Sequence, residues 1–202
     1  NAVTYQFQAF GETSGTETVP FVGASRLMAE GIGFGGEGDI LGAAATTFLN
    51  ALQPPATFSE IFTVDYEHNA VLMSHMGESN PAMHRADIPL RLRKRSPITD
   101  TSGAQLVLTV SAQPGEATLV SLNQGPNNDW QLITAPMTIM DSPPLESLAV
   151  PHFKMQPDGD VRDFLTAYAK AGGPHHNAVC FGDARRKLQM AASILDVDYV
   201  EI

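Results

Sequence analysis

Residues Gly33–Asp39 have the sequence GFGGEGD, which places Glu37 among glycines and directly before an apolar segment. That segment, Ile40–Leu52, is predicted to be a helix, and Asp39 is a residue type that caps helix N-termini. Glycine allows tight backbone turns and the close approach of a ligand. Glu37 is therefore expected at a helix N-terminus, where the helix dipole favours an ionised carboxylate. A carboxylate in this setting suits a metal ligand or an acid/base group, and the alternative is a solvated acid in a surface loop.

The chain changes character at Pro54-Pro55. Before the prolines, Val3–Phe10 alternates and is rich in aromatic and β-branched residues, which predicts a strand. A helix is predicted from Pro20 to about Glu30, because proline is tolerated in the first helical turn. A strand, a helix, a glycine loop and a second helix in this order are typical of an α/β layer.

After the prolines, short β-type runs alternate with clusters of Asn, Gly, Pro and Ser, which indicates an antiparallel sheet or barrel. The strands predicted there are Thr57–Tyr66, Ala70–Met76, Ile88–Leu92, Gln105–Ser111, Ala117–Leu122, Trp130–Met140 and Asp198–Ile202. The helices predicted there are Val161–Ala171 and Ala184–Leu195. The predicted fold class is α/β plus antiparallel β, with an α/β part at 1–54 and a β-rich part with helices at 55–202.

The charge of the chain restricts its partners. The 202 residues carry a formal net charge of −10, which argues against a nucleic-acid partner because the phosphate backbone favours Lys and Arg. A local basic cluster lies at Arg91–Arg95. Its arginines, Arg91, Arg93 and Arg95, alternate, so we expect them on the solvent face of a strand.

Cysteine content and hydropathy bear on the compartment. Cys180 is the only cysteine, so no intrachain disulfide can form, and a reducing compartment is expected. As a lone thiol it is expected to be buried rather than nucleophilic. No apolar run is long enough to span a bilayer, and no signal peptide is found. We therefore expect a cytoplasmic protein without a membrane partner.

Gly31, Gly33 and Gly36 match the dinucleotide fingerprint G-x-G-x-x-G. The fingerprint requires these glycines between a strand and a helix of a βαβ unit. Here the preceding residues Ser25–Glu30 are predicted to be helical, and no complete βαβ unit is predicted around them. The match alone is weak evidence, and a nucleotide-binding module is only a minor alternative.

Further ligand-type residues occur in settings similar to that of Glu37. Glu60 lies in a predicted strand and shares a face with Phe58 and Phe62 if the strand alternates. Buried charges are usually paired or bound to a metal, so this carboxylate is a candidate ligand.

Three histidines are also candidates. His75 follows an apolar run, and His175 and His176 follow Gly172-Gly173-Pro174. Each histidine taken singly is more often a structural residue. Together with two carboxylates, however, one or two imidazoles would form a mixed oxygen and nitrogen site that suits Mn²⁺ or another divalent first-row ion.

At these residues the sequence resembles the L-arabinose isomerase family. The segments that carry the resemblance are Ala24–Met28, Gly31–Asp39, Thr57–Glu60, Val71–Met76, Ala171–His176 and, more weakly, Phe153–Asp158. The resemblance covers nearly the whole chain, but only the C-terminal portion of a family member. It implies the end of a central α/β domain followed by a C-terminal antiparallel β-barrel domain.

The resemblance also implies a metal site. In the family, two glutamates and two histidines hold a divalent ion, usually manganese, and the matching residues here are Glu37, Glu60, His75 and His176. Both glutamates are credited with the acid/base work of aldose–ketose isomerisation through an enediol, and the sequence leaves open which one is the base. Phe10 falls where the family places an aromatic against the sugar, and His175 is assigned to the substrate site.

Family members are hexamers whose sites are completed by neighbouring subunits, so a homo-oligomer with a small-molecule sugar substrate is implied. The chain departs from the family pattern at Ile40, at Ile61-Phe62 and at Gly77–Asn80. These departures leave the identity of the substrate sugar undetermined: it could be an aldopentose, a deoxyhexose such as fucose, or a modified sugar. The other alternative is a metal- or sugar-binding homologue that has lost catalysis.

Overall fold

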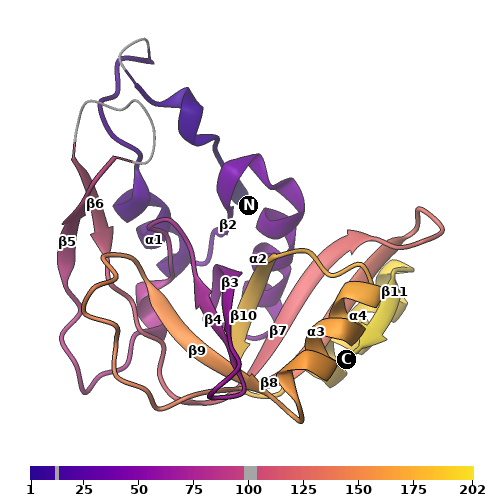
Figure 1. Ribbon diagram of the computed structural model, residues 1–202. Helices are drawn as coiled ribbons and strands as arrows, with labels where there is room; N and C mark the ends of the chain where they lie inside the picture. Colours follow the sequence, from indigo (N-terminus) through magenta and orange to yellow (C-terminus); the bar gives the residue numbers. More distant parts are fainter. Residues whose placement is uncertain (12–13, 98–103) are drawn as a thin grey trace.

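The computed structural model describes residues 1–11, 14–97 and 104–202, and most of its strands form one antiparallel barrel. The barrel strands are β3 (Ala56–Asp65), β4 (Ala70–Ser74), β7 (Gly115–Gln124), β8 (Trp130–Ile139), β9 (His152–Pro157) and β10 (His176–Phe181). They are hydrogen-bonded in the order β8, β7, β10, β3, β4 and β9, and β9 pairs again with β8, which closes the sheet (Figure 1). The barrel predicted from the sequence is thus confirmed. Another strand, β11 (Asp198–Glu201), pairs in parallel with β8.

The alternation of side chains along the strands separates the barrel interior from its outer surface. Met73 and Ile133 belong to the interior cluster, which also contains Phe164 of α3 (Val161–Lys170). Helix α3 therefore contributes to the interior core.

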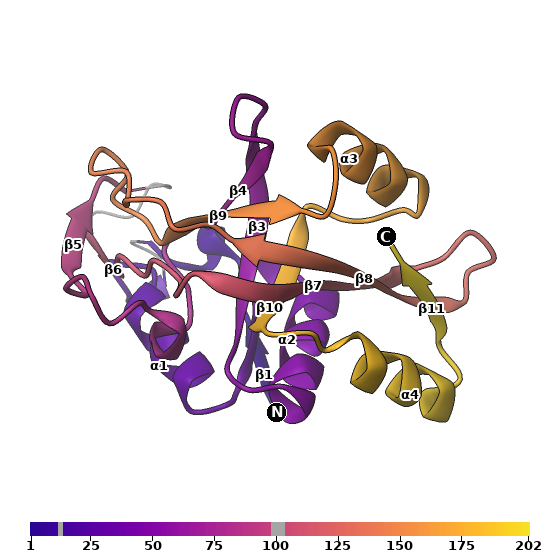
Figure 2. The same cartoon turned by 90° about the horizontal axis from the view of Figure 1, so that it is seen from below.

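The outer surface of the barrel is covered by two other helices. Leu132 of β8 packs in one cluster with Leu49 of α2 (Ile40–Leu52) and Leu188 of α4 (Arg185–Leu195). In Figure 2, α3 and α4 lie on opposite sides of the sheet around β8 and β11. Helix α2 thus joins the N-terminal residues to the barrel by a shared apolar core.

The N-terminal part forms a small α/β layer. Strands β1 (Ala2–Thr4) and β2 (Gly33–Gly35) pair in parallel, and α1 (Phe21–Ala29) connects them. The expectation that no βαβ unit surrounds the glycines was therefore wrong. The dinucleotide fingerprint is still not formed, because Gly31 precedes β2 and Gly33 lies inside it, so that only Gly36 lies between this strand and α2.

Many elements were predicted within one or two residues. The helices α1, α2, α3 and α4 are confirmed, as are the strands β3, β4, β8 and β11 at slightly different ends. Strand β7 is longer than predicted, and β2, β9 and β10 were not predicted as strands. The described residues also include short 3-10 turns, namely η1 (Phe7–Ala9), η3 (Gly36–Gly38) and η4 (Pro81–Met83).

The strand predicted over Val3–Phe10 was wrong in its second half. The strand ends at Thr4, and η1 follows it. The reason is tertiary packing, because Phe7 is buried in an aromatic cluster where its ring lies 5.9 Å from that of Phe21. An alternating strand would have carried Phe7 away from this cluster.

The strand predicted over Ile88–Leu92 was also wrong. The strand in this region is β5 (Leu92–Arg95), which pairs with β6 (Gln105–Leu108) in a separate two-stranded sheet. The strand was predicted too early because the residues before Leu92 are apolar. Pairing with β6, and not local composition, decides where β5 begins.

The arginines of β5 do not form its solvent face. Lys94 is exposed, whereas Arg93 and Arg95 are partly buried. Arg93 donates to the main-chain carbonyl of Glu146, and Arg95 donates to that of Met76. The expectation of an arginine-lined outer face was therefore wrong for these two side chains.

Cys180 is fully buried, as predicted, and burial raises the pKa of its thiol to about 12. The thiol is therefore protonated and unsuited to nucleophilic attack. None of the helices in the described residues is long and apolar enough to cross a bilayer. The cytoplasmic location and the domain boundary near Pro54 stay predictions.

Candidate metal centre

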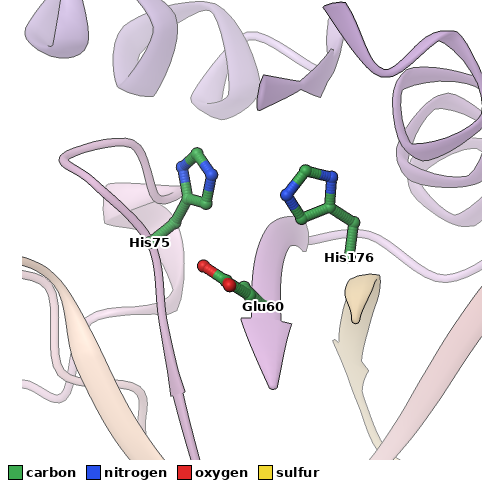
Figure 3. A group of neighbouring side chains, drawn as sticks. All are labelled: Glu60, His75 and His176. Atoms are coloured by element: carbon green, nitrogen blue, oxygen red, sulfur yellow. The ribbon is translucent and has the colours of Figure 1, made fainter. Parts of the chain in front are cut away.

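Strand register brings three of the predicted ligands together. Glu60 in β3 lies opposite His176 of β10 on one side and opposite Ser74 of β4 on the other. His75 directly follows Ser74, so it reaches the same end of the barrel. The ligand atoms of Glu60, His75 and His176 all lie within 4.8 Å of one another (Figure 3).

His75 is held by a buried hydrogen-bond chain. Its Nδ1 donates to Glu78 Oε2 at 2.8 Å, and the Tyr5 hydroxyl donates to Glu78 Oε1 at 2.7 Å. The His75 and Glu78 side chains are 1% and 0% exposed. Because Nδ1 carries the proton, the His75 Nε2 lone pair is free, and this buried atom has no hydrogen-bond partner within the described part of the chain.

His176 is oriented in the same way by another carboxylate. Its Nδ1 lies 3.0 Å from Asp39 Oδ2, while Asp39 Oδ1 accepts from the Gly42 N–H at 2.8 Å and caps α2. The capping role predicted for Asp39 is thus confirmed, and the same side chain also fixes the imidazole. His176 Nε2 then lies 3.9 Å from Glu37 Oε2.

Carboxylates dominate the electrostatics of the cluster. Burial opposes the charged form of His75, but the charge of Glu78 and its hydrogen bond outweigh burial and raise the His75 pKa. Burial likewise opposes ionisation of Asp39, yet the hydrogen bonds from His176 and the Gly42 N–H lower the Asp39 pKa. The raised pKa of His75 therefore reflects the negative charge around its imidazole, which favours a cation at this place.

Glu37 lies beside the three-residue cluster rather than inside it. Its side chain is 44% exposed, and its backbone has φ 59°, a left-handed conformation that costs free energy for a residue with a side chain. The Gln6 side chain donates to the Glu37 carbonyl oxygen, and the Gly38 N–H donates to the Tyr5 carbonyl oxygen. These bonds hold the turn in its strained form, and such strain is typical of functional sites.

Gly36 lets the glycine-rich turn approach the cluster. A Cβ at this position would overlap the His75 ring, so any larger residue would displace the imidazole. Phe58 completes the wall, with its ring centroid 4.9 Å from that of His75 and 5.0 Å from that of His176. The predicted apolar face of Glu60 is therefore formed by Phe58 alone. Phe62 is 44% exposed, because the register shifts between Ile61 and Thr63.

The loop that carries the histidine pair is supported from α3. The Tyr168 hydroxyl lies 2.9 Å from the Pro174 carbonyl oxygen and accepts from Asn177 Nδ2 at 2.6 Å. His175 is exposed, and its ring centroid lies 4.3 Å from that of His176. His175 thus borders the cluster without being one of its three members.

Phe10 is not placed against the cluster. Its ring packs edge-on against Tyr5 at 5.3 Å, whereas the ring of Phe7 lies 6.1 Å from that of His75. Phe7 is therefore the aromatic nearest the candidate centre from this segment. Sequence reasoning missed Phe7 because Phe10 was chosen by the family resemblance, and the predicted strand did not show the turn η1 that carries Phe7.

The residues present fit a divalent metal ion. The buried, unpartnered His75 Nε2, the His176 Nε2 and a Glu60 oxygen supply two nitrogens and one oxygen within a 4.8 Å group. The other nitrogen of each imidazole is bound to a carboxylate, which is the usual arrangement around metal-ligating histidines. Sequence reasoning missed Glu78 as the partner of His75, although Glu78 lies only three residues further along the chain.

A closed antiparallel barrel with a Glu/His cluster at one end defines the chain as a barrel domain with a candidate metal centre. Comparison with known families agrees with this description. The profile of the family described as L-arabinose isomerase C-terminal domain matches residues 55–198, and the chain belongs to this family.

Relatives with known names extend the match beyond the barrel. The chain is 31% identical to the L-arabinose isomerase of Acidothermus cellulolyticus over an alignment of 214 positions, which covers 100% of this chain and 40% of the relative. It is 29% identical to the L-arabinose isomerase of Mannheimia succiniciproducens, across 97% of this chain and 41% of the relative. The L-arabinose isomerase of Phocaeicola vulgatus is also 29% identical, with 98% and 40% covered. The chain therefore spans about 40% of the length of these relatives.

Proposed function

We propose that this chain supplies the C-terminal domain of a metal-dependent aldose–ketose isomerase similar to L-arabinose isomerase. The observation that supports the proposal best is the convergence of Glu60, His75 and His176, with the outer nitrogen of each imidazole bound to a carboxylate. Its family membership and its similarity to L-arabinose isomerases point to a sugar as the substrate. A homo-oligomer, a hexamer by the family resemblance, belongs to the same proposal.

Glu60, His75 and His176 would hold the ion, with Glu37 at its edge. Mn²⁺ in this place would supply Lewis-acid polarisation of two adjacent sugar oxygens. Glu78 and Asp39 keep the two imidazoles in the tautomer whose Nε2 lone pair faces the cluster.

We assign the proton transfer between carbons to Glu37. A base removes the proton from C2 of the aldose, the C–H electrons form the C1–C2 double bond, and the carbonyl oxygen on C1 takes up a proton to give the enediol. Return of the proton to C1 and loss of the O2 proton then give the ketose. Glu37 lies outside the three-residue group, so its carboxylate would be free to act on the substrate while Glu60 holds the ion.

The test uses the full-length protein with Mn²⁺ and a panel of pentoses, deoxyhexoses and modified sugars. Glu37→Gln should lower turnover by about 10² to 10⁴-fold, because it removes the base. The same variant should retain Mn²⁺ binding, whereas Glu60→Gln should weaken both binding and turnover. Glu116→Gln, at an exposed position of β7, is the control and should change neither.

Two outcomes would contradict this assignment. Wild-type turnover in the Glu37→Gln variant would show that Glu37 is not the base. A wild-type protein that binds Mn²⁺ but isomerises no sugar of the panel would favour the binding homologue without catalysis.

A further inference from the structure

A cavity of about 410 Å³ borders the candidate metal centre through His75. Its wall also contains Met76 and Phe62, which adjoin the cluster in sequence, and it extends to Lys94 and Arg95 at the end of β5. The volume falls within the range of about 300–1,000 Å³ that is common for small-molecule sites. A sugar whose reacting carbons lie at His75 would therefore extend its other end toward β5.

The charge of this cavity is opposite to that of the whole chain. Among the described residues, its lining includes two cations and no carboxylate, although the chain has a formal net charge of −10. The Lys94 side chain makes no ion pair or hydrogen bond with any described residue. The Lys94 ammonium is therefore available to a ligand.

Arg95 is the second cation, and it is partly buried. Its guanidinium donates to the main-chain carbonyls of Met76 and Ser96, which are neutral acceptors. No carboxylate among the described residues forms an ion pair with it. Burial lowers the Arg95 pKa, and the more distant charge of Glu78 offsets this only in part.

Several other cations among the described residues are balanced by carboxylates. Arg85 forms ion pairs with Asp87 and Asp141, and Lys154 pairs with Asp65. The contrast matters because a partly buried charge without a counter-charge is unfavourable unless a ligand supplies one. No carboxylate of the described residues supplies such a counter-charge on the Arg95 side of the cavity.

We propose that Lys94 and Arg95 bind an anionic group, a phosphate or a carboxylate, at the end of the sugar remote from the reacting carbons. This inference rests on the proposed isomerase function and names its substrate class as charged aldoses and ketoses. A guanidinium presents a planar fork of donors that matches the oxygens of either anion. A neutral pentose would leave both cations without a counter-charge when it displaces water from the cavity.

The kinetic test compares matched substrates in the full-length protein with Mn²⁺. The substrates are a neutral aldopentose, its 5-phosphate and a hexuronate, and the measured quantity is kcat/KM for conversion to the ketose. At least one anionic sugar should exceed the neutral one by about 10-fold or more, since hydrogen bonds to charged groups contribute about 1.5–3 kcal/mol. The anion that is preferred identifies the group as phosphate or carboxylate.

Variants of similar side-chain size show which cation is responsible for the preference for anionic sugars. Arg95→Met should reduce kcat/KM for the preferred anionic sugar by about 10 to 100-fold and leave that of the neutral sugar almost unchanged. Lys94→Met should act in the same direction with a smaller effect, because Lys94 is exposed. Arg93→Met is the control, because Arg93 lies in the same strand but lines a different cavity. Thermal melting shows whether each variant is folded.

A binding measurement separates this inference from the proposed function. Calorimetry with a pentitol 5-phosphate, which cannot be isomerised, is compared with calorimetry of the neutral pentitol. Tighter binding of the phosphate that Arg95→Met removes, without turnover of any sugar, would support the anion subsite and overturn the isomerase proposal. Turnover of neutral sugars at least as efficient as that of anionic ones, with no selective effect of Arg95→Met, would overturn the subsite and leave the isomerase proposal intact. Absence of both binding and turnover with all these probes would overturn both.

Discussion

At the scale of single residues, the least expected feature is the charge of Glu78. Its carboxylate is completely buried, yet both of its oxygens are used, one by His75 Nδ1 and the other by the Tyr5 hydroxyl. Burial, followed by the charge and the hydrogen bond of Glu78, raises the Tyr5 pKa, so Tyr5 remains a donor. Glu78 is therefore a positioning residue that acts on the cluster through His75.

Glu78→Gln tests this role. We expect the Mn²⁺ affinity to fall by about 10 to 100-fold. Without its carboxylate partner, a metal-ligating histidine is no longer held in one tautomer and one ring orientation. Calorimetric titration with Mn²⁺ measures the affinity, and ¹⁵N chemical shifts of the His75 imidazole report the tautomer in the metal-free protein. Tyr5→Phe should also lower the Mn²⁺ affinity and change the His75 tautomer, but to a smaller extent.

Glu67→Gln is the matched control, because Glu67 is exposed. A purely structural role of Glu78 would lower the melting temperature but leave the Nδ1–H tautomer of His75 and the Mn²⁺ affinity of the folded protein unchanged.

At the scale of elements, the barrel depends on contacts that reach across strands. Asp65 at the end of β3 accepts from Lys154 Nζ at 2.6 Å, although Lys154 belongs to β9 and β4 lies between the two strands. The Lys154 hydrogen bond is the main cause of a lowered Asp65 pKa, with the His68 main-chain N–H as a further donor. The Asp65–Lys154 pair thus links β3 and β9, the two strands on either side of β4.

Asp65→Asn tests the contribution of this link through its pH dependence. Because the folded-state pKa is lowered, the stabilisation is present above the unfolded pKa of about 3.9 and is lost as the pH falls through the folded value. The variant should therefore melt at a lower temperature than the wild type at neutral pH. The difference should shrink as the pH falls below about 4. Melting curves over a pH series measure it, and a difference that does not depend on pH would show that the lost contact is not the ionised pair.

At the scale of the whole molecule, the barrel and the N-terminal layer share two apolar clusters. Phe58 of β3 is buried in a cluster with Met28 of α1 and Phe34 of β2, and Leu49 of α2 packs against the outer face of the barrel. Asp39 also comes from the N-terminal part and orients His176. The predicted boundary near Pro54 therefore divides the sequence without separating the structural support of the candidate site.

A chain of residues 55–202 tests this dependence. Full burial of one large apolar side chain contributes about 1.5–3 kcal/mol. Removal of residues 1–54 exposes Phe58 and the apolar outer surface of the barrel, and the burial free energy lost is comparable with the whole free energy of unfolding of a typical domain. We expect this chain to melt well below the chain of residues 1–202, to bind a hydrophobic dye and to bind Mn²⁺ more weakly. Circular dichroism, dye fluorescence and calorimetry measure these three properties. Equal melting temperatures would show that the barrel is independently stable.

The sequence by itself determined the local elements and the chemical types at the site. The helix Ile40–Leu52 and its cap Asp39 follow from local composition, because helix formation and capping involve residues only a few positions apart. The strands around Glu60 and His75 follow from short apolar runs between turn residues. The set Glu60, His75 and His176 was predictable because the motifs of a known family carry it.

Only the tertiary structure decided which of these residues meet and how each is oriented. Glu60 reaches His176 through pairing with β10, a strand that was not predicted, and His75 owes its orientation to Glu78 and to the distant Tyr5. In the same way, burial of Phe7 and the pairing of β5 with β6 replaced two predicted strands and turned Arg95 toward a cavity. The physical reason is that periodicity along the chain specifies which face a side chain occupies, whereas its neighbours depend on strand register and packing between segments far apart in sequence.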